Sequence, residues 1–390
     1  MYALEGIRVL DLSTHLAGPA TSQYLGDQGA EVIKIEPPGA GDPTRETNPD
    51  PFYQGNPPGF ALINRNKQSI TIDIRKQEGQ EIICKLVDGA DVLVHNLRPA
   101  VAKRYHLDYA DLSKRNSRLV YASISAYGLK GPYADKGGYD RILQGLGGLM
   151  TRRLPDGMPI TTGVYASDGA TPMLMSYGIM LALWVREKTG RGQKVEGSLL
   201  HTWLALQAGT IALAEQGPPP VRDNAAVTPG VFRCGDGSYI NIAANNERQL
   251  ASLACVFGLE ALVKDPSYND PAVRARLRTH IYEIVKQRLL EGSSREWLQR
   301  VLDADVPCGP VLDKDDVFKE PQIIESGMLT TVDHPVIGPV TMTSPAVRLS
   351  ETPGGVRAPS PTLGEHTDNI LKSLDYSPEA ISRLHKQGVV

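Results

Sequence analysis

The sequence predicts an α/β protein in which a mostly parallel β-sheet is covered by helices on both faces. Two observations support this prediction. Apolar runs of strand length alternate with helix-length segments between residues 7 and 125. The 38 glycines and 29 prolines fall between these short elements rather than in low-complexity tracts. A length of 390 residues suits about two or three domains.

The first strand–helix–strand unit carries the clearest signals. Strands are expected at 7–13 (IRVLDLS) and 31–36 (EVIKIE), and the helix at 18–29 has Pro19 in its first turn and Gly29 at its end. The alternation continues with expected strands at 69–74, 91–97 and 118–125 and expected helices at 78–87 and 109–114. Successive units of this kind give a parallel sheet.

The second half of the chain changes character. Long helical patterns at 139–150 and 168–188 are followed by a break at TGRGQ (189–193) and by GPPP (217–220), which is typical of a linker. Beyond it, a hairpin-like segment at 231–243 and helices near 247–256, 271–290 and 294–302 indicate a smaller α+β domain over about 221–320. A short strand at 338–343 and a last helix from about 377 complete the prediction.

Composition excludes several classes of function. With 41 Lys and Arg against 44 Asp and Glu, the net charge is −3, which argues against a nucleic-acid partner. The uncharged runs at 169–185 and 197–214 contain Pro172, Ser176, His201 and Gln207, so we expect buried helices and no membrane partner.

Four cysteines without metal-binding spacing predict reduced thiols, no metal site and a cytoplasmic protein. The N-terminus has no signal-peptide pattern.

Because the chain begins with a βαβ unit, its first turn can be checked for the glycine motif of dinucleotide-binding proteins. A Rossmann turn needs G-x-G-x-x-G so that the backbone can approach a pyrophosphate. The first turn here, STHLAGPATS (13–22), has one glycine, and Glu36 at the end of the second strand is a weak signal by itself. NAD binding is therefore not expected.

Several ordered strings together resemble one family, the class III CoA-transferases of the CaiB–BaiF type. They run from residue 4 to beyond residue 366 and read HLAGP (15–19), LGDQGAEVIKIEPPGAGDPTR (25–45), NRNKQSITIDI (64–74), DVLVHNLRP (91–99), ISAYGLKGPYADKGGYD (124–140), TGVYASDGAT (162–171), REKTGRGQKVEGSLL (186–200), DVPCGPV (305–311), EPQ (320–322) and LGEHT (363–367).

The resemblance implies a domain layout. A Rossmann-like large domain would be formed by both chain ends, 1–205 and 328–390, with the small α+β domain at 221–320 inserted through linkers at 206–220 and 321–327. It also implies a homodimer of interlocked subunits.

The resemblance makes Asp168 the catalytic residue. Its carboxylate would attack an acyl-CoA thioester to give an aspartyl anhydride, and the released CoA would then form an aspartyl-CoA thioester from which an acceptor acid takes the CoA. From its position alone, Asp168 reads as the N-cap of a long helix, and the two interpretations are compatible.

Tyr139 bears on the sub-class. The resemblance also covers α-methylacyl-CoA racemases, in which a histidine base stands at this position, and a phenol with a pKa near 10 is a poor base at pH 7. Tyr139 therefore favours CoA transfer. A racemase or epimerase and a non-catalytic CoA-binding protein remain the alternatives. Formyl-CoA transferases carry a glycine run where this chain has AANNERQ (243–249), which argues against a formyl or oxalate substrate.

Coenzyme A is expected as a substrate, from a donor such as succinyl-CoA, and not as a tightly bound cofactor. Arg75, Arg98 and Arg104 would bind its phosphates, and a small carboxylic acid would be the acceptor. The positions that match the family's CoA contacts are His15, Leu16, Ile72, Arg75, Asn96, Leu97, Arg98, Arg104, Lys136 and Tyr139.

Overall fold

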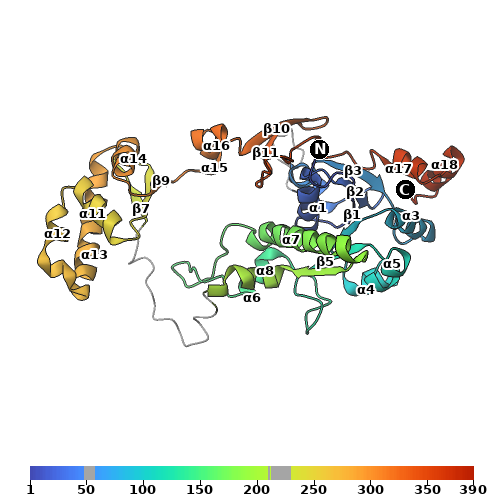
Figure 1. The fold of residues 1–390 in the computed structure, drawn as a ribbon, viewed down its shortest axis with the longest axis horizontal. Coiled ribbons are helices and arrows are strands. Elements are labelled where there is room, and N and C mark those ends of the chain that lie inside the picture. Colours follow the sequence, from blue (N-terminus) through green and yellow to red (C-terminus); the bar gives the residue numbers. More distant parts are fainter. Residues whose placement is uncertain (48–57, 210, 212–229) are drawn as a thin grey trace. The chain divides into compact units, whose positions relative to one another are not determined.

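The computed structural model describes residues 1–47, 58–209, 211 and 230–390 (Figure 1). The chain groups into two compact units. The large unit comprises Met1–Gly209 and Gly327–Val390, and the small unit is Thr210–Ser326.

A six-stranded sheet forms the centre of the large unit. Its order is β3-β2-β1-β4-β5-β6, and every neighbouring pair is parallel. This confirms the predicted parallel α/β sheet. The strand order reverses between β1 and β4, so this pair marks the topological switch point at which such sheets bind ligands. The strands are β1 (Arg8–Leu12), β2 (Glu31–Glu36), β3 (Lys67–Thr71), β4 (Val92–His95), β5 (Val120–Ser125) and β6 (Lys194–Ser198).

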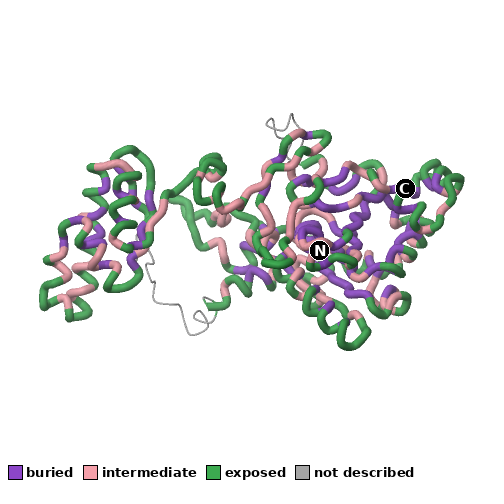
Figure 2. Tube along the Cα trace, turned by 45° about the horizontal axis from the view of Figure 1, so that its top comes forward, coloured by how far each residue is buried: buried purple, intermediate pink, exposed green. Residues whose placement is uncertain are grey.

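Helices cover both faces of this sheet. One apolar core joins the sheet to α3 (Gln77–Asp88), α5 (Tyr109–Arg115), α17 (Thr367–Ser373) and α18 (Pro378–Lys386). The other joins it to α1 (Ala17–Asp27), α6 (Asp140–Leu146), α7 (Ala166–Thr189) and α8 (Leu199–Leu206). Figure 2 shows the buried residues concentrated along the strands between these helices. The short helices α2 (Gly59–Ile63) and α4 (Pro99–Arg104) and the hairpin β10 (Leu329–His334)–β11 (Gly338–Thr343) complete the unit.

The edge strand β3 is covered by the C-terminal end of the chain. Ser69 N–H donates to His366 Nδ1 at 3.2 Å, Thr71 N–H to Thr367 Oγ1 at 3.1 Å, and Asp73 N–H to the Val389 carbonyl at 2.7 Å. An edge strand with unpaired N–H groups is a template for unwanted pairing. The C-terminal segment therefore satisfies the edge that the sheet would otherwise expose.

The small unit has its own core. An antiparallel sheet of β7 (Val231–Arg233), β8 (Tyr239–Ile242) and β9 (Cys308–Pro310) packs with helices, as expected for an α+β unit. Asn246 caps α11 by accepting the Gln249 N–H at 2.9 Å, which supports the turn interpretation of this stretch. The helices are α11 (Glu247–Val256), α12 (Glu260–Lys264), α13 (Pro271–Arg288), α14 (Ser294–Asp303), α15 (Lys314–Val317) and α16 (Pro321–Glu325).

Some elements differ from the prediction. β6 and β10 were not expected as strands, and β3 begins two residues earlier than predicted. α16 fills most of 321–327, which was expected as a linker, and most of the 206–220 linker lies outside the described residues. The predicted domain bounds stay a prediction.

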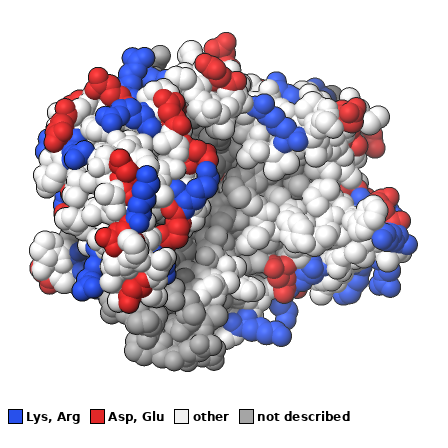
Figure 3. All heavy atoms as spheres, turned by 60° about the vertical axis from the view of Figure 1, so that its left-hand side comes forward, with Lys and Arg blue, Asp and Glu red and all other residues white. Residues whose placement is uncertain are grey.

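Acidic and basic side chains are intermixed on the surface of the molecule that Figure 3 draws. Within the described ranges, no helix is both long enough and apolar enough to cross a bilayer.

Candidate active site

A cavity of about 600 Å³ opens at the carboxyl edge of the sheet. Its walls come from the loops after β1, β4, β5 and β6 and from the first turn of α7, so it lies at the switch point. Eight residues that the sequence nominated line it: His15, Leu16, Asn96, Leu97, Arg98, Lys136, Tyr139 and Asp168.

The loop between β1 and α1 is anchored by a buried ion pair. His15 has a φ of +68°, which is uncommon for a residue other than glycine, and its N–H donates to Asp42 Oδ1 at 3.3 Å. Asp42 Oδ2 in turn pairs with Lys34 Nζ at 3.0 Å, and both side chains are fully buried. Without Asp42, the buried Lys34 ammonium would keep only the more distant Asp11 carboxylate, 3.9 Å away, and the Ser13 carbonyl. This ion pair therefore fixes the loop that presents His15 and Leu16.

Gly18 lets this loop turn tightly into α1. A Cβ on Gly18 would lie 2.3 Å from Ser13 Cβ, so only glycine fits the position.

Asn96 connects the loop after β1 to the loop after β4. Its Oδ1 accepts the Thr14 N–H at 3.0 Å, and its Nδ2 donates to the Thr14 carbonyl at 2.8 Å. The Asn96 side chain is thus a clamp between the loops after β1 and β4.

Two basic residues supply positive charge at the cavity. Arg98 is the N-cap residue of α4, and a Cβ on Gly137 would lie 2.9 Å from Arg98 Nη2. The glycine beside Lys136 therefore lets the guanidinium approach the loop that carries the lysine. Neither Arg98 nor Lys136 forms an ion pair within the described part of the chain, and both are exposed. Their charges are available to an anionic ligand.

Asp168 lies in the first turn of α7, where backbone N–H groups and the helix dipole favour a negative charge. Two other effects oppose ionisation. Burial and, secondly, the neighbouring Asp140 carboxylate raise the pKa of Asp168 to about 6. A carboxyl with such a pKa is mostly ionised at pH 7 but is a better nucleophile than a fully solvated one.

Asp140 organises this turn from a separate helix. The residue is 1% exposed, and its Oδ2 accepts the Ser167 N–H at 2.9 Å and the Ser167 hydroxyl at 2.6 Å. Its Oδ1 accepts from Gln144 Nε2 at 2.6 Å. This arrangement was not predicted from the sequence, although Asp140 follows Tyr139 in GGYD (137–140). Tyr139 itself lies edge-on to His15, with ring centres 5.6 Å apart.

Three nominated residues do not line this cavity. Ile72 is 1% exposed and belongs to the core between the sheet and the C-terminal helices. Arg75 is exposed and makes two hydrogen bonds to the Asp73 carboxylate, at 2.8 and 2.9 Å. Arg104 is exposed in the last turn of α4. A part for these residues in CoA binding stays a prediction.

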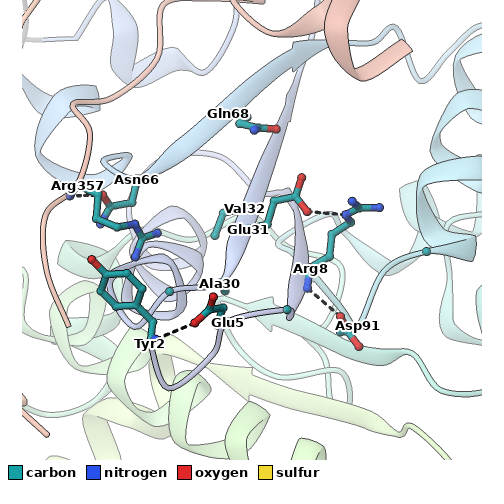
Figure 4. Close-up of a pocket in the computed structure, with 13 residues that line it drawn as sticks. Tyr2, Glu5, Arg8, Ala30, Glu31, Val32, Asn66, Gln68, Asp91 and Arg357 are labelled. Carbon is teal, nitrogen blue, oxygen red and sulfur yellow. Dashed lines mark hydrogen bonds and ion pairs between the residues drawn. The ribbon is translucent and has the colours of Figure 1, made fainter. Parts of the chain in front are cut away.

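Another polar cavity lies at the opposite, amino edge of the sheet (Figure 4). Its charged groups are largely satisfied by one another: Arg8 Nε pairs with Glu31 at 2.8 Å, and Arg8 N–H donates to Asp91 at 2.8 Å. Parallel sheets bind ligands at their carboxyl edge. The cavity that Asp168 lines is therefore the candidate active site.

A switch-point cavity with a carboxyl of raised pKa and two basic residues that have no ion pair within the described ranges is typical of an α/β enzyme with an anionic substrate. The chain matches the model of "CoA-transferase family III" over residues 4–367 and belongs to that family. Enzymes of this family act on CoA thioesters.

Individual relatives agree with this assignment. The chain is 36% identical to a succinyl-CoA:glutarate CoA-transferase from Mus musculus, over 100% of this chain and 91% of the relative. It is 32% identical to a succinyl-CoA–D-citramalate CoA-transferase from Chloroflexus aurantiacus, over 95% and 94%. The crystal structure of a CAIB/BAIF family protein from Brucella suis has a TM-score of 0.82 at 33% identity and covers 96% of this chain and 100% of that one.

Proposed function

We propose that this protein transfers CoA from an acyl-CoA donor, such as succinyl-CoA, to a small dicarboxylic acid, with Asp168 as the nucleophile. The observation that carries the proposal is the position of Asp168, which lines the switch-point cavity together with Arg98 and Lys136. The acceptor class is supported by relatives named for glutarate and D-citramalate.

The first half-reaction moves CoA onto the enzyme. The Asp168 carboxylate attacks the thioester carbonyl, the C–S bond breaks, and a mixed anhydride and the CoA thiolate form. The thiolate then attacks the Asp168 carbonyl of the anhydride and displaces the donor's carboxylate. An aspartyl-CoA thioester remains.

The second half-reaction reverses these steps with the acceptor. Its carboxylate attacks the aspartyl thioester, and the thiolate that leaves attacks the acceptor's own carbonyl. The products are the new acyl-CoA and a free Asp168 carboxylate. Water must stay out because both intermediates hydrolyse.

The cavity supplies binding and electrostatics for this route. Arg98 and Lys136 suit the CoA phosphates. The N-terminal N–H groups of α7 suit the negative charge on each tetrahedral intermediate. Gly169 follows Asp168 in α7, and a Cβ there would meet no atom within 4 Å, so we propose that the thioester approaches through this open space.

The test is Asp168→Asn, assayed with succinyl-CoA and a panel of small acids that includes glutarate and D-citramalate. We expect transfer to be lost, and mass spectrometry of the wild-type enzyme with donor alone should find CoA on the peptide that carries Asp168. The exposed Asp135→Asn is the matched control. Transfer at near wild-type rate by Asp168→Asn would overturn the mechanism. Solvent deuterium entering the α-carbon without an acceptor would indicate the racemase, and CoA binding without turnover would indicate a non-catalytic protein.

The proposal includes a homodimer with interlocked subunits. α7 exposes a row of large apolar side chains, which soluble monomers seldom leave in water: Met173, Leu174, Tyr177, Met180, Leu181, Trp184 and Val185. Light scattering after gel filtration should give twice the mass of the chain, and Trp184→Arg, which places a charge in this apolar row, should raise the fraction of monomer. A monomeric wild type would refute the dimer.

The proposed compartment is the cytoplasm, because the four free thiols suit a reducing environment.

A further inference from the structure

A second cavity, of about 240 Å³, lies by the carboxyl ends of β4 and β5 on the sheet face covered by α3 and α5. It shares Leu97, Pro99 and Ile124 with the active-site cavity, but Asp168 does not line it. A water molecule occupies about 30 Å³ in the liquid, so the space admits a small organic or inorganic ion.

Two buried polar atoms, on residues that line this cavity, have no hydrogen-bond partner in the described chain. They are His95 Nε2 and Ser123 Oγ, on residues 4% and 6% exposed. His95 and Ser123 are paired neighbours on β4 and β5, so their side chains project from the same face about 5 Å apart. Buried polar atoms nearly always have partners, and two adjacent exceptions that line one cavity indicate a ligand.

The His95 ring presents a hydrogen-bond donor to the cavity. Its Nδ1 accepts the Leu97 N–H at 3.1 Å, which assigns the ring proton of the neutral form to Nε2. Burial and the positive charge of Lys194 lower the pKa of His95 to about 4, so the ring is neutral at pH 7. The Ser123 hydroxyl rotates freely and can donate as well. The complementary group is an acceptor.

The cavity is lined by two lysines and one aspartate, and Lys103 supplies the positive charge that an anion would meet. Lys103 and Lys194 line the cavity and are exposed, and within the described residues Lys103 has no ion pair. Lys194 pairs with Glu196. Asp108 also lines the cavity, but its carboxylate accepts the Asp111 N–H at the start of α5, and the Tyr121 hydroxyl is occupied by the Leu107 carbonyl.

We infer that this cavity binds a small oxyanion, a carboxylate or a phosphate, which accepts hydrogen bonds from His95 Nε2–H and Ser123 Oγ–H and is attracted by Lys103 and Lys194. Because His95 Nδ1 holds the Leu97 N–H, the anion site touches the loop that also lines the active-site cavity. The site does not depend on the proposed reaction.

The test follows the His95 ring in histidine-selectively ¹⁵N-labelled protein, with the signal identified by its loss in His95→Gln. Inorganic phosphate and glutarate are titrated separately in chloride buffer at constant ionic strength. We expect a saturable shift of the Nε2 signal with one of the two anions, and the anion that produces it distinguishes a phosphate from a carboxylate site. No saturable shift with either anion, as when water alone fills the cavity, overturns the inference.

Three variants make the test specific. Ser123→Ala should weaken the affinity about tenfold, since a hydrogen bond to an ion is lost. Ser360→Ala is the matched control, because Ser360 Oγ is also buried without a recorded partner but does not line this cavity, and its titration should equal that of the wild type. Asp168→Asn should also titrate like the wild type, which separates this site from the active site. A Ser123→Ala titration that matches the wild type refutes the site.

Discussion

Asp140 and Ser167 are joined by two hydrogen bonds, in which Asp140 Oδ2 accepts both the backbone N–H and the hydroxyl of Ser167. This contact fixes the first turn of α7, one residue before Asp168. The same carboxylate raises the pKa of Asp168. Asp140 therefore couples the geometry of the proposed nucleophile to its charge state.

The rate of CoA transfer should fall as the pH drops through about 6. Asp168 attacks only when ionised, so activity is present above its pKa and lost below it. Asp140→Asn keeps an oxygen acceptor for Ser167 but removes the charge, and the acid limb of kcat/KM against pH should move to lower pH. Burial, the larger cause, is unchanged, so the limb should stay above about 4. An acid limb that does not move in the variant would contradict this role of Asp140.

Asp168→Asn should make the folded protein more stable at pH 7, on the order of 1 kcal/mol. The folded-state pKa of about 6 lies above the unfolded value, so ionisation between pH 4 and 6 costs stability in the wild type. The gain is smaller than full linkage predicts because the side chain is partly solvated. Urea unfolding at pH 7 and pH 4 checks this, and the gain should shrink at pH 4. Equal stability of the variant and the wild type at pH 7 would show that ionisation of Asp168 does not destabilise the folded protein.

Arg98→Ala should raise the KM for acyl-CoA about tenfold or more, whereas Arg75→Ala should change it less. Arg98 lines the cavity without an ion pair in the described chain, but Arg75 is held by Asp73. A hydrogen bond to a phosphate is among the stronger contacts a guanidinium makes. Steady-state kinetics with one acyl-CoA compare the two variants directly. The opposite ranking would place the phosphates nearer to Arg75, which was expected from the sequence to share them with Arg98 and Arg104.

Two glycine-to-alanine changes should have opposite effects on stability. Gly18→Ala forces a Cβ against Ser13 and should cost about 1–3 kcal/mol. Gly169→Ala meets no protein atom and should gain up to about 1 kcal/mol from helix propensity. Gly169→Ala should nevertheless slow transfer, because its methyl group enters the space beside Asp168. Denaturant unfolding and transfer assays measure both, and an unimpaired Gly169→Ala enzyme would mean that the thioester approaches from elsewhere.

The apolar strands could be predicted because their composition reports burial directly. β1 and β2 are almost wholly buried, and their runs of Val, Ile and Leu show it. β6 was missed because KVEGS alternates exposed and partly buried residues at the sheet edge and has the composition of a loop. Edge strands are defined by their neighbours rather than by their own hydropathy.

In the candidate site, too, the features that depend on tertiary contacts could not be predicted from the sequence. His15, Asn96 and Arg98 were expected from short strings that follow strands, and the structure places them at one cavity. The Asp140–Ser167 contact could not be predicted, since it joins two helices through a buried carboxylate. The pairing of Lys34 with Asp42 is likewise a tertiary contact, and in sequence Lys34 looks like an ordinary polar residue of a strand.

The covered edge of β3 has a consequence for how the chain folds. His366, which bonds to Ser69, is made 297 residues later. At a synthesis rate of about 5–20 residues per second, the segment that covers β3 is made roughly 15–60 s after β3 itself. During that time the ribosome-bound sheet carries an open edge, and contacts of such long sequence separation form slowly. Cells that make this protein therefore face their greatest risk of aggregation before the last segment leaves the ribosome, and truncation of α17 and α18 should extend that risk to the finished chain.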